Sequence, residues 1–369
     1  MNTAPIFENS LIPLKKGKYH VELWPAVLEA YDAGKNKETV IGLLNYIDSS
    51  LLDKSGNADH TEFVIPNGSI NIYMSLKDNM IRIKAPFLAL PEKGTIPLLR
   101  QIAEINFYKL NLSQIHLEDN RMYFHFETPL ELCEPYKIFD TLKEICSNAD
   151  YHDDLFIEKF GAVRIDPIKA KDFTPEMKEK AWGLFQKYID ESLEYATYFE
   201  GKRTYNLAMD ALFQMFCKID YFIAPQGFVK VRIERLIEEM YAQGELSHII
   251  AKSKKDIAEF KKIDRKLFDE CLYIPDFLIP PKYRAELSTF QGQVQDNIFR
   301  WREEATHANY VGATMMCLSA ILNFLYRNDI PLNLKQKITD AMLNSSGKPW
   351  KDASEVLLKA VGEIIAGTV

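Results

Sequence analysis

The sequence has few cysteines, and none of them is spaced for a metal site or a redox motif. The five cysteines among 369 residues are far apart, and no two are separated by only two residues. This spacing excludes zinc ribbons and thioredoxin-type redox motifs. Free cysteines on apolar stretches act as small hydrophobic residues. We therefore expect a reducing compartment, and a cytoplasmic location for the chain.

The chain also lacks a long, purely apolar run. Its first twenty residues contain no apolar segment of the kind found in a secretory signal. Residues 305–326 carry no formal charge, but polar side chains interrupt the stretch at Thr306, His307, Asn309, Thr314, Ser319 and Asn323. Such a pattern is typical of a buried helix in a bundle rather than a membrane span. We therefore expect no membrane partner.

Motifs for phosphates, cofactors and hydrolysis are missing as well. The sequence contains no Gly-x-Gly-x-x-Gly, no complete phosphate-binding loop, no Gly-x-Ser-x-Gly and no His-Glu-x-x-His. The formal net charge is −7, so no overall basic field favours nucleic acid. We expect no cofactor and no nucleic-acid partner.

The first half of the chain alternates between helical and extended patterns. Asn67-Gly68 separates two period-2 segments, and Asn-Gly between extended runs is a strong hairpin signal. A two-residue turn at Asp119-Asn120 would place Leu117 opposite Met122 in a second hairpin. The expected elements are helices at 22–33 and 37–50, strands at 61–66, 69–76 and 80–86, a helix at 95–109, strands at 112–118 and 121–127, and a long helix at 134–158.

This order of elements resembles a known fold. The matching text is IRIKAPFLALP, followed by IPLLRQIAEINFYKLNLSQIHLEDNRMYFHFETPL and YKIFDTLKEICSNADYHDDLF. Residues 61–158 are similar in pattern to the type III secretion chaperone-like fold, including the CesT and YbjN-like families. The resemblance implies a domain that binds polypeptide segments or dimerises, with no chemistry of its own.

The second half of the chain reads as purely helical. The predicted helices cover 175–199, 203–222, 226–242, 246–272, 282–305, 307–327, 333–344 and 350–366. The helix at 203–222 is apolar almost all round, apart from a polar stripe of Asp210, Gln214 and Lys218. The fold class is therefore an α+β domain followed by an all-α helical bundle. We expect an α+β domain at 1–160, a linker at 161–173 and an all-α domain at 174–369.

Candidate partner-binding residues lie on the second predicted hairpin and on one helix. His116, Tyr123 and His125 point away from the predicted core, so they could form a small polar site on the open face of the sheet. Trp301 lies between two arginines and could anchor a partner. The alternative is that the histidines are ordinary solvated residues and that Trp301 is a core residue.

One pattern suggests a metal site instead. Glu245-x-x-His248 and Glu304-x-x-His307 each place a carboxylate and an imidazole on one helix face. Two such pairs, with one glutamate from each of two further helices, form the di-metal site of ferritin-like carboxylate proteins. The additional ligands could come from Glu191, Glu194, Glu259 or Glu270. The alternative is two surface pairs that never meet.

Together these features favour a non-catalytic protein of the chaperone or adaptor type. We expect it to bind a polypeptide partner or a second copy of itself, through a sheet edge or an apolar groove. The alternative is a metal-dependent enzyme with a carboxylate–histidine site in the helical domain.

Overall fold

The chain folds into two compact units, and each is discontinuous in sequence. The computed structural model describes residues 2–14, 19–166, 170–280 and 282–367. The α+β unit comprises residues 18–171 and 274–281, and the helical unit comprises residues 1–17, 172–273 and 282–369. The expected contiguous ranges 1–160 and 174–369 therefore differ from the observed grouping at two segments, 1–17 and 274–281.

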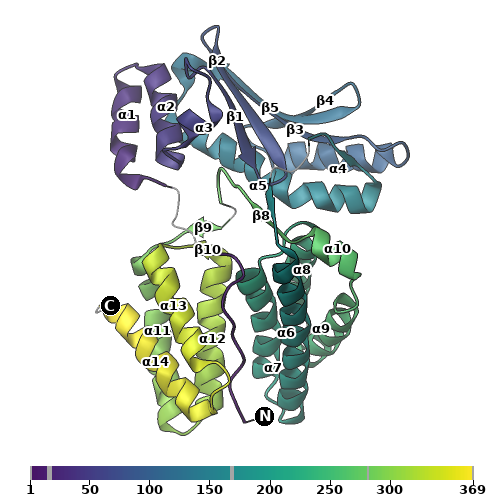
Figure 1. Ribbon diagram of the computed structural model, residues 1–369, viewed down its shortest axis with the longest axis vertical. Coiled ribbons are helices and arrows are strands. Elements are labelled where there is room, and N and C mark those ends of the chain that lie inside the picture. Colours follow the sequence, from purple (N-terminus) through teal and green to yellow (C-terminus); the bar gives the residue numbers. More distant parts are fainter. Residues whose placement is uncertain (1, 15–18, 167–169, 281, 368–369) are drawn as a thin grey trace. The chain divides into compact units, whose positions relative to one another are not determined.

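The α+β unit is built on an antiparallel sheet (Figure 1). Within the described residues the strands follow the order β1-β2-β3-β5-β4, and β6 pairs with the end of β3 on the side opposite β5. The elements are α1 (Trp24–Asp32), α2 (Asn36–Ile47), α3 (Leu51–Ser55), β1 (Glu62–Asn67), β2 (Ile70–Lys77), β3 (Met80–Ala89), α4 (Thr95–Tyr108), β4 (Gln114–Glu118), β5 (Arg121–Pro129), α5 (Pro135–Phe160) and β6 (Val163–Arg164), with short 3-10 turns at Val21–Leu23 and Leu130–Leu132.

The predicted register of the second hairpin is confirmed. Leu117 lies opposite Met122 and Ile115 lies opposite Phe124. Met122 and Phe124 are fully buried under the face of the sheet that α5 covers (Figure 1). Because residues two apart share a face of a strand, His116, Tyr123 and His125 fall on the opposite face, which no helix of this unit covers among the described residues.

The first hairpin differs from the prediction in its turn. Asn67 pairs with Ile70, so the two turn residues are Gly68 and Ser69 rather than Asn67 and Gly68. Of these residues, only Gly68 has a positive φ. Asn67 ends the strand, and its side chain is buried. Its Oδ1 accepts hydrogen bonds from the main-chain N–H groups of Leu278 and Ile279, which offset the cost of burying the amide oxygen.

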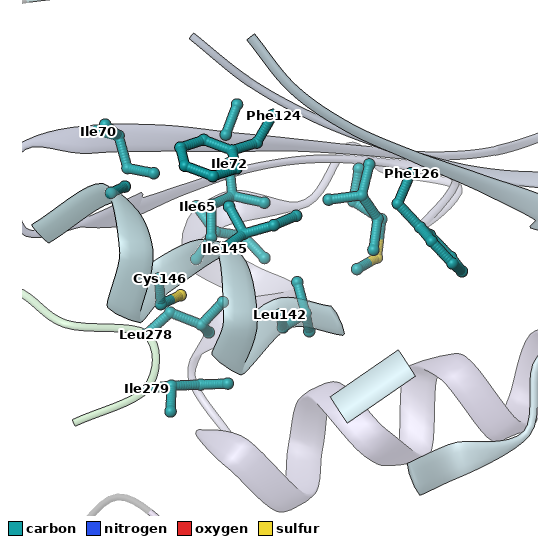
Figure 2. Close-up of a cluster of buried hydrophobic side chains, with 14 of the residues drawn as sticks. Ile65, Ile70, Ile72, Phe124, Phe126, Leu142, Ile145, Cys146, Leu278 and Ile279 are labelled. Atoms are coloured by element: carbon teal, nitrogen blue, oxygen red, sulfur yellow. The ribbon is translucent and has the colours of Figure 1, made fainter. Parts of the chain in front are cut away.

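Residues 274–281 complete the core of the α+β unit. The N–H of Gly68 donates to the carbonyl of Asp276, and the side chains of Leu278 and Ile279 are buried. Figure 2 shows Leu278 beside Cys146 of α5, below the sheet residues Ile65 and Ile72. This segment lies between two predicted helices of the second half of the sequence, so sequence order alone assigns it to the wrong domain.

The predicted linker 161–173 is partly exposed and partly anchored along its described length. Val163 and Arg164 form β6 and pair with Ala89 and Leu88 of β3. The side chains of Ala162 and Phe173 are buried, while residues 167–169 lie outside the described part of the chain. Arg164 forms ion pairs with Asp153 and Asp154 of α5, and this anchors the start of the segment to the α+β unit.

Replacing Arg164 with methionine is expected to destabilise the α+β unit by about 3 kcal/mol, because a buried carboxylate that loses its partner is costly. Asp153 is 1% exposed, and burial raises its pKa to about 7. Loss of the arginine removes the main influence that lowers this pKa. A carboxyl group whose pKa is higher in the folded than in the unfolded state destabilises the fold as the pH rises and the group ionises. The loss of stability caused by Arg164→Met should therefore be larger at pH 8 than at pH 5.

Hydrogen-exchange mass spectrometry at both pH values can measure this effect on sheet peptides. The double variant Asp153→Asn/Arg164→Met has no carboxylate left to titrate at position 153 and is the matched control. A deficit for Arg164→Met that is equal at the two pH values would contradict the assignment of the effect to Asp153.

The helical unit contains the expected helices with a few breaks. The predicted helix 246–272 is interrupted after Phe260, and a π-helical turn at Ile219–Ile223 extends α7. The elements are α6 (Pro175–Gly201), α7 (Tyr205–Lys218), α8 (Gly227–Met240), α9 (Leu246–Phe260), α10 (Arg265–Glu270), α11 (Leu287–Thr306), α12 (Tyr310–Arg327), α13 (Leu332–Ser345) and α14 (Trp350–Ala366), with short strands β9 (Tyr283–Arg284) and β10 (Asn328–Asp329). Two more short strands, β7 (Ala170–Asp172) and β8 (Tyr273–Pro275), fall where the chain passes from one unit to the other.

The central helices of this unit are α7 and α12, which pack against each other. α12 also contacts α11 and α14, as expected for the uncharged segment 305–326. No helix in the described ranges is both long and apolar enough to cross a membrane. The polar stripe of α7 is enclosed rather than solvated, since Gln214 and Lys218 are each 2% exposed. These two side chains mark the candidate site.

Candidate functional site in the helical unit

The N-terminal residues 3–11, here called the strap, lie in a groove of the helical unit. Figure 1 shows this segment running between the helix pair α6–α7 and the pair α13–α14. Apart from one isolated bridge between Thr3 and Pro349, the strap belongs to no helix or strand in the described part of the chain. Proline at position 5 fixes its own φ and favours an extended conformation for Ala4. The strap is therefore held by contacts with the groove.

The groove binds the main chain of the strap along its first half. The hydroxyl of Tyr195 donates to the carbonyl of Thr3 at 2.7 Å, and the N–H of Ala4 donates to the carbonyl of Lys348 at 2.8 Å. The hydroxyl of Ser346 accepts from the N–H of Phe7 and donates to its carbonyl. These contacts fix the register of an extended segment without reading its side chains.

The second half of the strap meets the π-helical turn at the end of α7. The N–H of Leu11 donates to the carbonyl of Phe222 at 2.9 Å, and the hydroxyl of Ser10 reaches the carbonyl of Tyr221 at 3.4 Å. Tyr221 and Phe222 lie in the last turn before the helix ends at Ile223, where main-chain carbonyls have no partner within the helix. Here these carbonyls bind the strap.

A buried ion pair lies beneath the middle of the strap. The Nζ atom of Lys218 lies 2.6 Å from Oε2 of Glu191, and the other carboxylate oxygen accepts the N–H of Ile6 at 2.7 Å. The side chain of Lys218 is 3% exposed. Burial lowers the pKa of Lys218, while Glu191 acts in the opposite direction. Glu191 thus binds both the ammonium group of Lys218 on α7 and the main chain of the strap.

Aromatic rings surround the ammonium group of Lys218. Its Nζ atom lies 4.1 Å from the ring centroid of Tyr188 and 5.1 Å from that of Phe7. Phe7 is 4% exposed and also contacts the ring of Phe222, with the centroids 5.9 Å apart. Cation–π contacts of this kind favour an aromatic side chain at the position of Phe7.

With the strap in place, little space remains beside the ion pair. The cavity lined by Glu191, Gln214 and Lys218 has a volume of about 10 Å³, which is room for a single water molecule. The Oε1 atom of Gln214 is buried there, and among the described residues it has no hydrogen-bond partner. The arrangement suits the recognition of a main chain better than a reaction of the lysine amine.

Sequence reasoning did not identify this groove, although one signal was present. Asp210, Gln214 and Lys218 recur at intervals of four residues on an otherwise apolar helix. A polar stripe on a buried helix must find partners, because unpaired buried charges are costly. The sequence could not show that Glu191 of α6 is the partner of Lys218, or that the strap covers them both.

The structure brings together three residues predicted for the open face of the sheet. The rings of His116 and His125 stack with their centroids 4.9 Å apart, and the strand partner of His116 is Tyr123. Lys84 lies over the ring of Tyr123 and pairs with Glu118 at 2.5 Å. Burial, followed by the neighbouring His116, lowers the pKa of His125. The cluster is polar, and within it His116 is exposed whereas Tyr123 and His125 are half-buried.

Trp301 is a core residue rather than a surface anchor. It is 3% exposed on α11, and this helix packs against α12 and α14. The flanking residues Arg300 and Arg302 remain exposed. This burial agrees with the alternative that Trp301 is a core residue, whose ring lies on the side of the helix that faces the bundle.

The two Glu-x-x-His pairs lie at helix ends. Glu245 and His248 begin α9 and are 78% and 85% exposed. Glu304 lies near the end of α11, where it accepts a hydrogen bond from Asn309, and His307 is the exposed residue that ends that helix.

The glutamates suggested as additional metal ligands are placed elsewhere. Glu191 binds Lys218, Glu259 pairs with Lys262, Glu270 pairs with Lys266, and Glu194 is exposed. Within the described ranges, no group of three or more His, Cys, Asp or Glu side chains could hold a metal ion.

At each edge of the sheet, an asparagine occupies the main-chain groups of one strand residue. On β4, the side chain of Asn106 both donates to the carbonyl of Ile115 and accepts its N–H. On β1, Asn57 occupies both main-chain groups of Glu62 in the same way, through its own N–H and its Oδ1 atom. Pro66 further along β1 has no N–H. Natural proteins protect edge strands by such means, so strand addition is disfavoured here.

Comparison with known protein families gives no match for this chain, and comparison with curated protein sequences gives none either.

Proposed function

We propose that this protein is a non-catalytic polypeptide-binding protein, and that the groove of its helical unit is the binding site. The observation that carries the proposal is the strap, an extended segment whose main chain is bound by Glu191, Tyr195 and Ser346. A groove that contacts main-chain groups at fixed spacing can accept other extended segments, because every residue except proline offers the same groups.

One further feature supports recognition without chemistry, since the amine of Lys218 is held by Glu191. The pattern of residues 61–158 resembles that of secretion chaperone-like domains, and this resemblance agrees with a polypeptide partner. The asparagine contacts at the sheet edges make the groove the favoured site over β1 or β4.

Binding of a peptide in trans tests the proposal. In the full chain, Phe7→Ala removes the main buried side chain of the strap, a change that costs about 3–5 kcal/mol of packing in a buried site. A fluorescent peptide with the sequence of residues 2–13 should then occupy the groove. We expect saturable binding by fluorescence anisotropy.

The matched control is the same peptide methylated at the amide nitrogen of Ile6. It keeps every side chain but cannot donate to Glu191, and a hydrogen bond to a charged group contributes about 1.5–3 kcal/mol. Its binding should be at least tenfold weaker. Equal binding of the two peptides, or no binding of either, would refute the proposal.

A further inference from the structure

We infer that the strap is an internal competitor: it closes the groove, and a partner segment must displace it to bind. This inference rests on the proposed function and adds its regulation. The strap belongs to no helix or sheet ladder among the described residues, so its departure breaks no regular element of the helical unit. It is held by contacts with the groove, including its one isolated bridge, from Thr3 to Pro349.

The groove remains intact when the strap leaves. The ion pair between Lys218 and Glu191 joins α7 to α6 and involves no strap atom. Gln214 is bound independently to α12, through the carbonyl of Met315 and the hydroxyl of Ser319. The Oε1 atom of Glu191 would lose its contact with Ile6 and gain the N–H of the incoming segment. One main chain can therefore replace another.

The strap also indicates what kind of segment fits. Ala4 is 1% exposed, so its site accepts only a small side chain. Phe7, three residues later, fills the site between Lys218 and Phe222, which favours an aromatic ring. At the position of Ile6, the segment must keep a free N–H for Glu191. The partner we infer is an extended segment of another protein with a small residue, two intervening residues and an aromatic residue.

A reversible covalent lock tests the inference. Thr3 and Pro349 are antiparallel bridge partners, and such partners lie within the Cα separation that a disulfide spans. The native cysteines are all free and buried, so they should not interfere. The variant Phe7→Ala/Thr3→Cys/Pro349→Cys should bind the labelled peptide when reduced and lose at least tenfold in affinity when oxidised. The wild-type chain should bind at least tenfold more weakly than Phe7→Ala.

Each outcome separates the inference from the proposed function. Equal binding by the oxidised and reduced forms would show that the peptide binds outside the groove of the strap. That result would refute the inference that the strap competes with a partner, but polypeptide binding by the protein would still stand. No binding by either form, nor by Phe7→Ala, would overturn both. A disulfide-linked dimer would mean that the strap of a second copy enters the groove, and this would overturn a separate partner protein.

Discussion

Replacing Lys218 with methionine is expected to lower the free energy of unfolding of the helical unit by about 3 kcal/mol. Glu191 would then be a largely enclosed carboxylate, with a side-chain exposure of 15%, and would lack its cationic partner. Removing one member of a buried ion pair typically costs about 3–5 kcal/mol, whereas replacing both members is often nearly neutral. Because Glu191 retains some contact with solvent, we place the effect at the lower end of this range.

The double variant Lys218→Met/Glu191→Gln is the corresponding test of mechanism. The amide introduced by Glu191→Gln keeps an acceptor for the N–H of Ile6 and carries no charge, so most of the lost stability should return. Lys187→Met is the matched control, since Lys187 forms an exposed ion pair with Glu8 of the same strap, and exposed pairs contribute about 0–1 kcal/mol. Denaturant unfolding followed by circular dichroism measures all three variants. A loss in the double variant as large as in Lys218→Met would contradict the account.

Replacing Leu278 with alanine is expected to destabilise the α+β unit by about 3 kcal/mol, although the residue lies among the helices in sequence. Leu278 is 1% exposed and packs in the cluster beneath the sheet (Figure 2). Truncation of a buried leucine to alanine costs about 2–5 kcal/mol, because it removes apolar contacts and leaves a cavity.

Hydrogen exchange resolved by peptide can show which unit loses protection. We expect faster exchange in β1, β2 and α5, and unchanged exchange in α7 and α12. Leu132→Ala is the control, because this leucine is 51% exposed in the same unit and its truncation should change stability by at most about 0.5 kcal/mol. Loss of protection confined to the helical unit would contradict the assignment of residues 274–281 to the α+β unit.

Much of the secondary structure follows from local patterns in the sequence. The hairpin of β4 and β5 has the predicted register because Asp119-Asn120 supplies a two-residue turn, and both residues have positive φ. The start of α6 was also predictable, since Thr174 caps the helix by accepting the N–H of Met177 and Pro175 follows it. These features depend on residues close together in the chain.

The candidate sites were less predictable. His116, Tyr123 and His125 share a face as the strand period requires, but the period could not indicate whether a partner covers that face. The Glu-x-x-His spacing gave two pairs without a common centre, because the spacing fixes a helix face but not the position of that face in the bundle. Trp301 shows the same limit, since its arginine neighbours suggested a surface and its burial places it in the core.

Local sequence patterns were enough to specify the order of the longer helices and of strands β1 to β5, the antiparallel register of the second hairpin and the mainly helical nature of the second half. Tertiary packing was needed to show that the strap covers Glu191 and that Asn67 holds residues 278 and 279. The contacts of Ile6 with Glu191 and of Asn67 with Leu278 join residues 185 and 211 positions apart. Hydrophobic patterning specifies which residues are buried, whereas their partners depend on how distant elements pack. The groove, built from helices and a chain end that are far apart in the sequence, is a product of that packing.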